Sequence, residues 1–348
     1  MPEPLLLALG GLFRKRRILR ADKGGWELPI EFHGDSDGIA GSGVADEYYA
    51  ARDESALIDL SRWELLSLPR ARAGLLDRLL TQGARGLRPG QSRRSAWLDD
   101  EGRVRALLHL LAAEEDILIE CSREAAAGLC GQLGLDRGAP SREPGSMVAF
   151  GLLGPKFRGM FETAAPLKEG EHRDARLPGM SVPVRALKTQ DLPSGFLLYA
   201  ALAQAEDLWN GLQSAGVGPL GYSAFDSHRL VEGLPWYGFD VDERCTLEEA
   251  GLQEACGGAA GPKPSARLCR LMLDAVAMPG DKVLSEGREV GRVTTFEVEP
   301  TVGPCLAFAY LSEPWCESGT RVDVNRRPAL VAGMRAPLDR DSFKELII

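Results

Sequence analysis

The sequence offers little support for a metal site or a disulfide framework. It has four histidines among 348 residues, and no two of them form a His-x-x-x-His pair. The seven cysteines are odd in number and never form a Cys-x-x-Cys pair. Zinc knuckles and disulfide frameworks use paired, regular spacings. We therefore expect no protein-ligated metal, and thiols that stay reduced in the cytoplasm.

Long apolar runs and nucleotide-binding loops are also missing. Residues 4–13 are apolar but few, and the basic residues 14–17 follow them, whereas a secretory signal carries its charge before the apolar run. No later window approaches the length of a membrane span. A Gly-x-Gly-x-x-Gly after a strand, a phosphate loop and a Gly-x-Ser-x-Gly are all absent. These absences predict a cytoplasmic protein without a membrane partner.

The composition is that of a globular protein with an acidic surface. Hydrophobic residues make up 44% and charged residues 26%, which is typical of folded domains. The net charge of -9 argues against broad nucleic-acid binding. Because 348 residues exceed what one simple core accommodates, two or three domains are expected.

Hydrophobic periodicity predicts an α+β chain that ends in a β-rich segment. Helices are expected at 46–52, 71–80, 122–133 (with Ser122 as its cap), 204–212 and 224–232. Strands are expected at 27–32, 56–61, 104–111, 116–120, 182–187 and 195–200, and a strand with a turn at 148–156. From 267 to 338, short β-prone runs alternate with turns, which favours a small β-barrel or sandwich.

One stretch, residues 218–240, combines a turn, a helix, a break and an aromatic pair. Trp236 and Tyr237 follow the break and precede the flexible Gly238. Aromatic rings offer contact area at low entropic cost, and Arg229 adds a fixed charge, so the stretch could form the wall of a flat ligand's site. The alternative is a helix packed on a core with an ordinary aromatic plug, in which Arg229 pairs with an acid of its own helix.

The same stretch carries a family resemblance. Residues 224–233 read A-x-D-x-x-R-L-x-x-G, residues 237–240 read Y-G-x-D, and residues 246–252 read T-L-E-E-A-G-L. This pattern resembles the T-protein of the glycine cleavage system, a tetrahydrofolate-dependent aminomethyltransferase, and its YgfZ-type folate-binding relatives. Further similar segments follow in the family's order from about Trp26 onward. The resemblance therefore covers nearly the whole chain.

The resemblance implies a fold and a division into domains. The family fold is a three-domain ring of two α+β domains and a C-terminal small β-barrel, with folate in the central channel. The boundaries that we expect here are 1–55 with 146–252 for a discontinuous first α+β domain, 56–145 for an inserted α+β domain, 253–266 for a hinge, and 267–348 for the barrel.

The catalytic carboxylate of the family pattern is missing. T-proteins place it in Gly-Gly-x-x-Asp-Asp-Leu, and the matching segment here has Ala106 and Leu107 at the two acidic positions. An apolar side chain can neither take a proton nor stabilise a cationic amine intermediate. Asp99 and Asp100 precede the strand and are expected to be turn residues. The catalytic residues of this chain are therefore unknown from sequence.

Other folate contacts of the pattern are changed as well. The asparagine of Val-Val-Asn falls on Glu120, whose carboxylate could accept a bond from a pterin's amino group; the alternative is a surface acid at a strand end. Both glutamates of Gly-Glu-x-Gly-Phe-Glu are lost at 192–197. The arginine of Ala-Arg-Asp falls on Phe225, while Asp226 is kept.

The YgfZ-type signature is degraded too. When the signature is aligned with residues 256–267, its cysteine falls on Gly258. Cys256 is the one candidate replacement, and Lys263 could lower its pKa. The alternative reading of this segment is a flexible hinge.

These features lead to one preferred function and two alternatives. The preferred function is a folate-binding-type protein of this family without ordinary aminomethyl transfer, acting as an accessory factor for iron–sulfur enzymes or tRNA modification. The alternatives are a tetrahydrofolate-dependent aminomethyl (one-carbon) transferase, and a ligand-free relic fold that serves as a protein-interaction module. Expected partners are a folate-like small molecule, with tetrahydrofolate as the cofactor, and a protein. The expected ligand contacts are Glu120, Asp226, Arg229, Trp236 and Tyr237.

Overall fold

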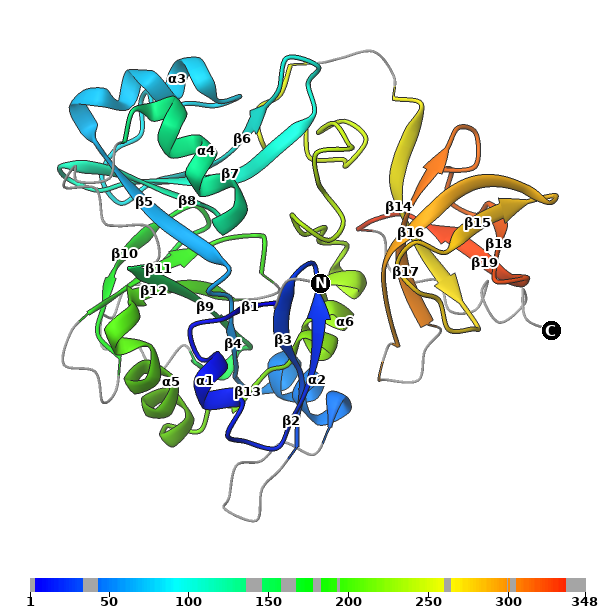
Figure 1. The fold of residues 1–348 in the computed structure, drawn as a ribbon, viewed down its shortest axis with the longest axis horizontal. Helices are drawn as coiled ribbons and strands as arrows, with labels where there is room; N and C mark the ends of the chain where they lie inside the picture. Colours follow the sequence, from blue (N-terminus) through cyan, green and yellow to red (C-terminus); the bar gives the residue numbers. More distant parts are fainter. Residues whose placement is uncertain are drawn as a thin grey trace. The chain divides into compact units, whose positions relative to one another are not determined.

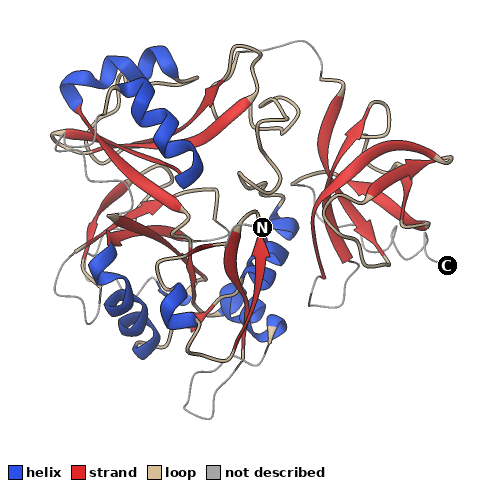
Figure 2. Cartoon of the chain, viewed as in Figure 1, coloured by secondary structure: helices blue, strands red, loops and turns tan. Residues whose placement is uncertain are grey.

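The computed structural model describes residues 4–33, 43–135, 146–157, 167–177, 183–192, 195–259, 264–298, 300 and 305–335. The chain divides into two compact units. The first unit comprises Met1–Leu98 and Arg105–Ala224, and the barrel unit comprises residues 99–104 and Phe225–Ile348. Figures 1 and 2 show their helices and strands. The predicted α+β class with a C-terminal barrel is confirmed.

The first unit begins with a small sheet of order β1-β3-β2. Its strands are β1 (Leu5–Leu6), β2 (Ile18–Lys23) and β3 (Trp26–Phe32), and β1 runs parallel to β3. Between β1 and β2 lies the short helix α1 (Gly10–Phe13), and α2 (Val44–Asp53) follows β3. The expected first strand and first long helix are confirmed, whereas β2 was not predicted.

A six-stranded sheet of order β10-β11-β12-β9-β4-β13 forms the centre of the first unit. Its strands are β4 (Ala56–Asp59), β9 (Met147–Leu153), β10 (His172–Ala175), β11 (Val184–Lys188), β12 (Phe196–Ala201) and β13 (Gly218–Pro219). The 3-10 turn η3 (Leu202–Gln204) leads into helix α5 (Ala205–Ser214).

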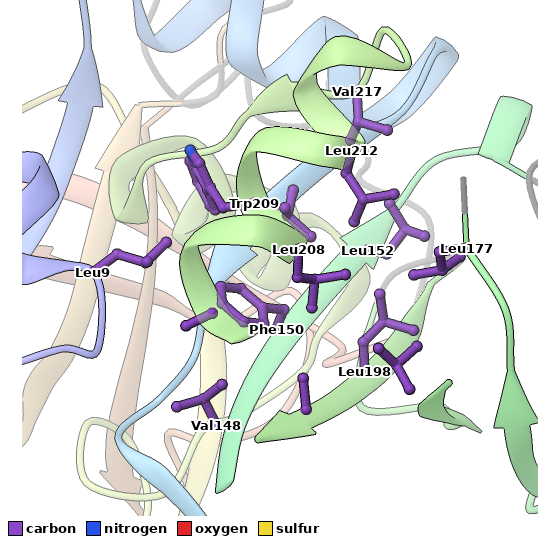
Figure 3. Packing of buried hydrophobic residues seen from close by; sticks show 14 of the residues in the cluster. Leu9, Val148, Phe150, Leu152, Leu177, Leu198, Leu208, Trp209, Leu212 and Val217 are labelled. Atoms are coloured by element: carbon purple, nitrogen blue, oxygen red, sulfur yellow. The ribbon is translucent and has the colours of Figure 1, made fainter. Parts of the chain in front are cut away.

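Helix α5 covers one face of this sheet. Its Leu208, Trp209 and Leu212 are fully buried and pack with Phe150 and Leu198 of the sheet, as Figure 3 shows. The apolar spacing of three to four residues along α5 places these side chains on one side of the helix. Since side chains alternate along a strand, the remaining residues of β11 and β12 point to the opposite face of the sheet.

A four-stranded antiparallel sheet of order β5-β8-β7-β6 completes the first unit. Its strands are β5 (Trp63–Pro69), β6 (Ser92–Leu98), β7 (Val104–Ala112) and β8 (Asp116–Ser122). One face is covered by α4 (Arg123–Leu133) and by the turn formed from η1 (Arg70–Leu75) and α3 (Leu76–Leu79). The Ser122 hydroxyl accepts the Ala125 N–H at 3.3 Å, so the predicted cap of α4 is confirmed.

The barrel unit contains a closed six-stranded barrel of order β14-β17-β16-β15-β18-β19. Its strands are β14 (Ala266–Leu273), β15 (Lys282–Ser285), β16 (Arg288–Val298), β17 (Cys305–Ser312), β18 (Arg321–Val324) and β19 (Arg327–Ala332). Small and β-branched side chains fill its interior, among them Val283, Val293, Ala307 and Val331. The division between the two units falls within helix α6 (Tyr222–Glu232), after Ala224.

The C-terminal part of α6 packs on the outside of this barrel. Leu230 is buried with Met272 and Phe308 in a second apolar cluster. The guanidinium of Arg270, on β14, donates to the carbonyls of Leu230 and Val231 and so caps the end of the helix. Residues 225–252 thus belong to the same compact unit as the barrel, and the three-domain division stays a prediction.

Within the described part of the chain, no helix has both the length and the apolar character needed to cross a membrane. The predicted linker at 137–146 lies outside the described residues except for Ser146.

Candidate functional site

Arg229 of helix α6 lies at the centre of a buried ion-pair network. The side chain is fully buried, and its guanidinium donates to Asp226 Oδ1 from Nη2 (2.6 Å) and Nε (3.0 Å). Its Nη1 donates to Asp240 Oδ2 at 2.8 Å and to the Leu234 carbonyl at 2.9 Å. Burial alone would lower the pKa of Arg229, but the charges of Asp226 and Asp240 outweigh it and raise the pKa. The pairing with an acid of its own helix, one of the two alternatives, is observed.

Asp240 extends this network to the barrel. Its Oδ2 also accepts the Trp236 N–H at 2.9 Å, and its Oδ1 accepts the hydroxyls of Thr294 (2.8 Å) and Thr295 (2.6 Å) on β16. Both carboxylate oxygens of Asp240 therefore have hydrogen-bond donors. The network therefore fastens α6, the loop that follows it and one barrel strand to one another.

The aromatic pair is packed into the same region. Trp236 is 7% exposed and Tyr237 is 8% exposed. The Trp236 ring meets Phe225 edge to face at 4.9 Å between centroids, and the Arg229 guanidinium lies 5.7 Å from its centroid. The barrel unit thus contains four of the five expected ligand contacts, and all four side chains are buried: Asp226, Arg229, Trp236 and Tyr237. Their role as ligand contacts stays a prediction.

Glu120 belongs to the first unit and lies in a different network. It is directly opposite His109 in the antiparallel pairing of β8 with β7, and His109 Nδ1 lies 2.5 Å from Glu120 Oε2. The other ring nitrogen, Nε2, lies 2.8 Å from Asp191 Oδ2. Arg94 Nη1 on β6 lies 2.8 Å from Asp191 Oδ1. We call Arg94, His109, Glu120 and Asp191 the His109 cluster.

The local structure explains how these four residues meet. His109 and Glu120 alternate with residues of the α4-side core, so they point to the opposite face of the four-stranded sheet. Asp191 lies in the turn after β11, where its backbone N–H donates to the Thr189 hydroxyl at 3.1 Å. Glu120, expected as a surface acid in the alternative reading, is 3% exposed.

Opposing effects set the protonation of the cluster. Burial would lower the pKa of His109, but the charge of Glu120 and the hydrogen bond to Asp191 raise it to about 10. Burial would raise the pKa of Asp191, but Arg94 and His109 hold it well below its usual value. At neutral pH the cluster therefore contains an imidazolium between two carboxylates, and Arg94 balances the remaining charge.

The cluster should make the stability of the protein pH-dependent. The folded pKa of His109 lies above its unfolded value of 6.5, so its contribution is complete below pH 6.5 and is lost as the pH rises through about 10. We expect His109→Gln to cost on the order of 3 kcal/mol near pH 6 and much less near pH 10. Urea unfolding between pH 6 and pH 10 measures the difference in free energy of unfolding between the wild type and His109→Gln. The exposed His33→Gln is the control. An equal difference at pH 6 and at pH 10 would contradict the raised pKa of His109.

The two positions that the resemblance assigns to the family's catalytic carboxylates are apolar and buried. Ala106 is fully buried and packs in the core beneath α4, and Leu107 is 6% exposed. Leu107 is two residues before His109 on β7, so both side chains leave the same face of the sheet. The His109 cluster also lies on that face, and its two acidic side chains are already paired.

The cysteines do not form a reactive site among the described residues. All seven are free thiols, and Cys256 is fully buried. Lys263, the expected partner of Cys256, lies outside the described residues. Glu313, Cys316 and Glu317 place one ligand atom each within 4.8 Å of one another, but Arg267 forms ion pairs with both glutamates. The Arg267 guanidinium therefore already supplies a positive charge to Glu313 and Glu317.

The Glu120 carboxylate could serve as a hydrogen-bond acceptor for part of a folate. The amino groups of a pterin need an acceptor, and Glu120 supplies a carboxylate whose orientation His109 fixes. The resemblance assigns this carboxylate to the position of the family's asparagine. Among the residues that sequence analysis missed, His109 could have been found, since it lies two residues past Leu107 and alternation places both on one face. Asp191 and Arg94 carried no such signal.

Comparison with known proteins gives consistent results over both units. The GCVT N-terminal domain family matches residues 15–258, and the glycine cleavage T-protein C-terminal barrel domain matches residues 267–335. An aminomethyltransferase of Synechococcus sp. (strain WH7803) is 27% identical, over 91% of this chain and 93% of the relative. An aminomethyltransferase of Nostoc sp. (strain PCC 7120 / SAG 25.82 / UTEX 2576) is 26% identical, over 92% of both chains.

The fold is similar to that of a solved structure. The crystal structure of the glycine cleavage system aminomethyltransferase T from Bartonella henselae has a TM-score of 0.78 to this chain. The two chains are 20% identical, and the match covers 94% of this chain and 96% of the other. At this identity the similarity concerns the fold.

Proposed function

Because this chain belongs to the glycine cleavage T-protein family, we propose that it binds a tetrahydrofolate-type ligand and does not catalyse ordinary aminomethyl transfer. One observation supports both parts. On the face of the sheet that carries Leu107, His109 pairs with both Glu120 and Asp191, and Arg94 also pairs with Asp191. An ion-paired carboxylate can accept a hydrogen bond from a ligand, but it is a poor proton acceptor.

In this proposal Glu120 is the ligand contact and His109 positions it. The carboxylate accepts a hydrogen bond from an amino group of the heteroaromatic ring, and the contact with His109 holds it in orientation. The bound folate would supply the one-carbon carrier chemistry of the family. The four expected contacts in the barrel unit stay predictions: Asp226, Arg229, Trp236 and Tyr237. The substitution Arg229→Met, described below, tests whether Arg229 has a structural role.

Freeing a base for aminomethyl transfer would be costly in this site. For Asp191 to take a proton from a substrate, it would have to leave both Arg94 and His109. Removing one partner of a buried ion pair costs about 3–5 kcal/mol, which would be added to the reaction barrier. The same holds for Glu120, whose partner His109 is shared with Asp191.

The alternative, a tetrahydrofolate-dependent aminomethyltransferase, has its own support. Curated relatives that match more than nine-tenths of this chain are named aminomethyltransferases. Asp191 also provides an acid from a loop, in place of the missing strand carboxylates. A turnover assay separates this alternative from the proposal.

Three further expectations stay predictions. An accessory role for iron–sulfur enzymes or tRNA modification follows from the YgfZ-type resemblance, yet Gly258 occupies the position of that signature's cysteine. A relic fold that binds a protein partner would show no response to folate. A cytoplasmic location is expected from the sequence.

Binding is tested by thermal denaturation in the presence of tetrahydrofolate. A ligand that binds only the native state adds about 2.7 kcal/mol of stability at a hundredfold excess over its Kd, which raises the Tm by several degrees. We expect Glu120→Gln to abolish most of this shift, since it loses the charge but keeps the shape. Glu115→Gln, on an exposed turn of the same hairpin, is the control. A wild-type Tm that does not respond to tetrahydrofolate would contradict the proposal.

A further inference from the structure

A run of basic residues near the start of the chain takes no part in the proposed ligand site. Residues 14–20 contain five basic side chains and no acidic one, in a chain whose net charge is -9. They follow helix α1 and include the first three residues of strand β2. We call residues 14–20 the basic segment. Its charge is opposite in sign to that of the chain as a whole, which points to a local role.

Most of this charge is not compensated by ion pairs within the described part of the chain. Two of the five cations share one carboxylate: Arg14 Nε and Nη2 donate to Glu27 at 2.9 Å each, and Arg20 Nε lies 3.7 Å from Glu27 Oε1. The other three form no ion pair with the described residues: Lys15, Arg16 and Arg17. The first and the last of these are exposed, and the middle one is half-buried. Three cations are therefore available to a partner.

The basic segment leads into a strand with an open edge. Strand β2 is at the edge of the small sheet of order β1-β3-β2 (Figure 1), and β3 is its one pairing partner among the described strands. Residues 19–22 are exposed, and Leu19 is 51% exposed although its side chain is apolar. An edge strand presents a row of backbone N–H and C=O groups that can pair with another extended chain.

The charge of the basic segment decides which kind of chain can pair with β2. A second copy of this protein would bring the same cations to the edge, and like charges on neighbouring strands repel. An acidic strand would be attracted instead. Proteins that bind single-stranded nucleic acid combine basic side chains with aromatic ones, on which bases stack. Residues 14–23 include no aromatic residue, so an acidic polypeptide fits this surface better than a nucleic acid.

We propose that β2 and the basic segment form a docking surface for an extended, acidic segment of another protein. That segment adds a strand to the sheet along the outer edge of β2, and its carboxylates pair with the three available cations. In such strand addition, backbone hydrogen bonds supply affinity and the charges supply selectivity. The proposal is independent of the folate site, because neither β2 nor the basic segment contains an expected ligand contact.

Titration of a labelled peptide with the full chain, followed by fluorescence anisotropy at about 50 mM salt, tests the proposal. The probe is Glu-Val-Glu-Val-Glu-Val-Glu, in which valine favours a strand. We expect saturable binding of this peptide. Binding should be at least about tenfold weaker when lysine replaces its glutamates, and likewise when proline replaces its valines. The proline peptide keeps the carboxylates but lacks backbone N–H groups that a strand needs.

Different outcomes would overturn different parts of the proposal. No saturable binding up to about 1 mM peptide would overturn the docking surface. Equal affinity for the proline peptide would show that charge acts without strand pairing. Tighter binding of an oligo(dT) of the same length than of the acidic peptide would make the surface a nucleic-acid site.

A charge-reversed variant tests the basic segment itself. It carries Lys15→Glu, Arg16→Glu and Arg17→Glu, and we expect it to bind the acidic peptide at least about tenfold more weakly. Its Tm should stay close to that of the wild type, because these side chains form no ion pair with the described residues. Its tetrahydrofolate-induced Tm shift should persist, so failure here is distinguishable from failure of the folate proposal.

The matched control makes the same change of charge in the barrel unit. It carries Arg321→Glu, Arg326→Glu and Arg327→Glu, at exposed arginines of β18, of β19 and of the turn between them. The control should bind the peptide as the wild type does. An equal loss of affinity in both variants would show that net charge governs binding, and it would contradict the role of the basic segment.

Discussion

Replacing Arg229 with methionine is expected to lower the free energy of unfolding by about 3–5 kcal/mol. The substitution keeps most of the side-chain volume but leaves Asp226 and Asp240 buried without their cation. Asp240 keeps its bonds from Thr294 and Thr295, which limits the loss at that residue. The larger share of the loss is therefore expected from Asp226.

Urea unfolding of Arg229→Met measures this loss, and Arg244→Met is its matched control. Arg244 forms an ion pair with Asp242 but is 82% exposed, and exposed pairs contribute about 0–1 kcal/mol. If Arg229→Met does not fold, the triple variant that also carries Asp226→Asn and Asp240→Asn should recover part of the stability, because it removes the stranded charges. If Arg229→Met is as stable as the wild type but loses its response to tetrahydrofolate, Arg229 is a ligand contact and not a structural residue.

Gly233→Ala is expected to cost about 2–5 kcal/mol, because two separate penalties meet at this position. Gly233 follows the last residue of α6 with a φ of +69°, and the Leu234 N–H bonds to the Arg229 carbonyl, as in a Schellman motif. A Cβ added at Gly233 would lie 1.7 Å from the carbonyl oxygen of Met334. A backbone oxygen cannot move aside as a flexible side chain can, so the end of α6 would have to shift.

Gly251→Ala separates the two penalties. Gly251 has nearly the same φ, +68°, but no atom lies within 4 Å of its would-be Cβ. The alanine there should cost only the left-handed conformation, about 1–2 kcal/mol. Thermal or urea unfolding of both variants gives the cost of the contact as their difference. Equal losses would mean that Gly233 does not lie against Met334.

Periodic features of this chain were predictable from its sequence. Helix α4 and its Ser122 cap, the strands β7 and β8, and the repeated short strands of the barrel follow from spacing and capping chemistry. The ion pair of Asp226 with Arg229 follows from their separation of three residues on one helix. Each of these features depends on residues that are close together in the sequence, so a single segment is enough to predict it.

Features that depend on distant segments were not predictable. The helix expected at 71–80 is a 3-10 turn followed by one short α-helix, η1 and α3. Strand β2 was not predicted, because it follows a run of basic residues and depends on its pairing with β3. Asp191 reaches His109 from a turn that is distant in sequence, and no spacing rule connects the two. Paired carboxylates and a protonated histidine were therefore missed, although Glu120 itself was expected as a contact.

The central claim is that this member of the family holds a folate without transferring an aminomethyl group. The measurement that tests it most directly is the rate of methylene-tetrahydrofolate formation from tetrahydrofolate and an aminomethylated carrier protein, at ligand concentrations that raise the Tm. We expect no rate above the uncatalysed one, because His109 and Arg94 hold Glu120 and Asp191 in ion pairs. Turnover that depends on the chain and is lost in Asp191→Asn would contradict it.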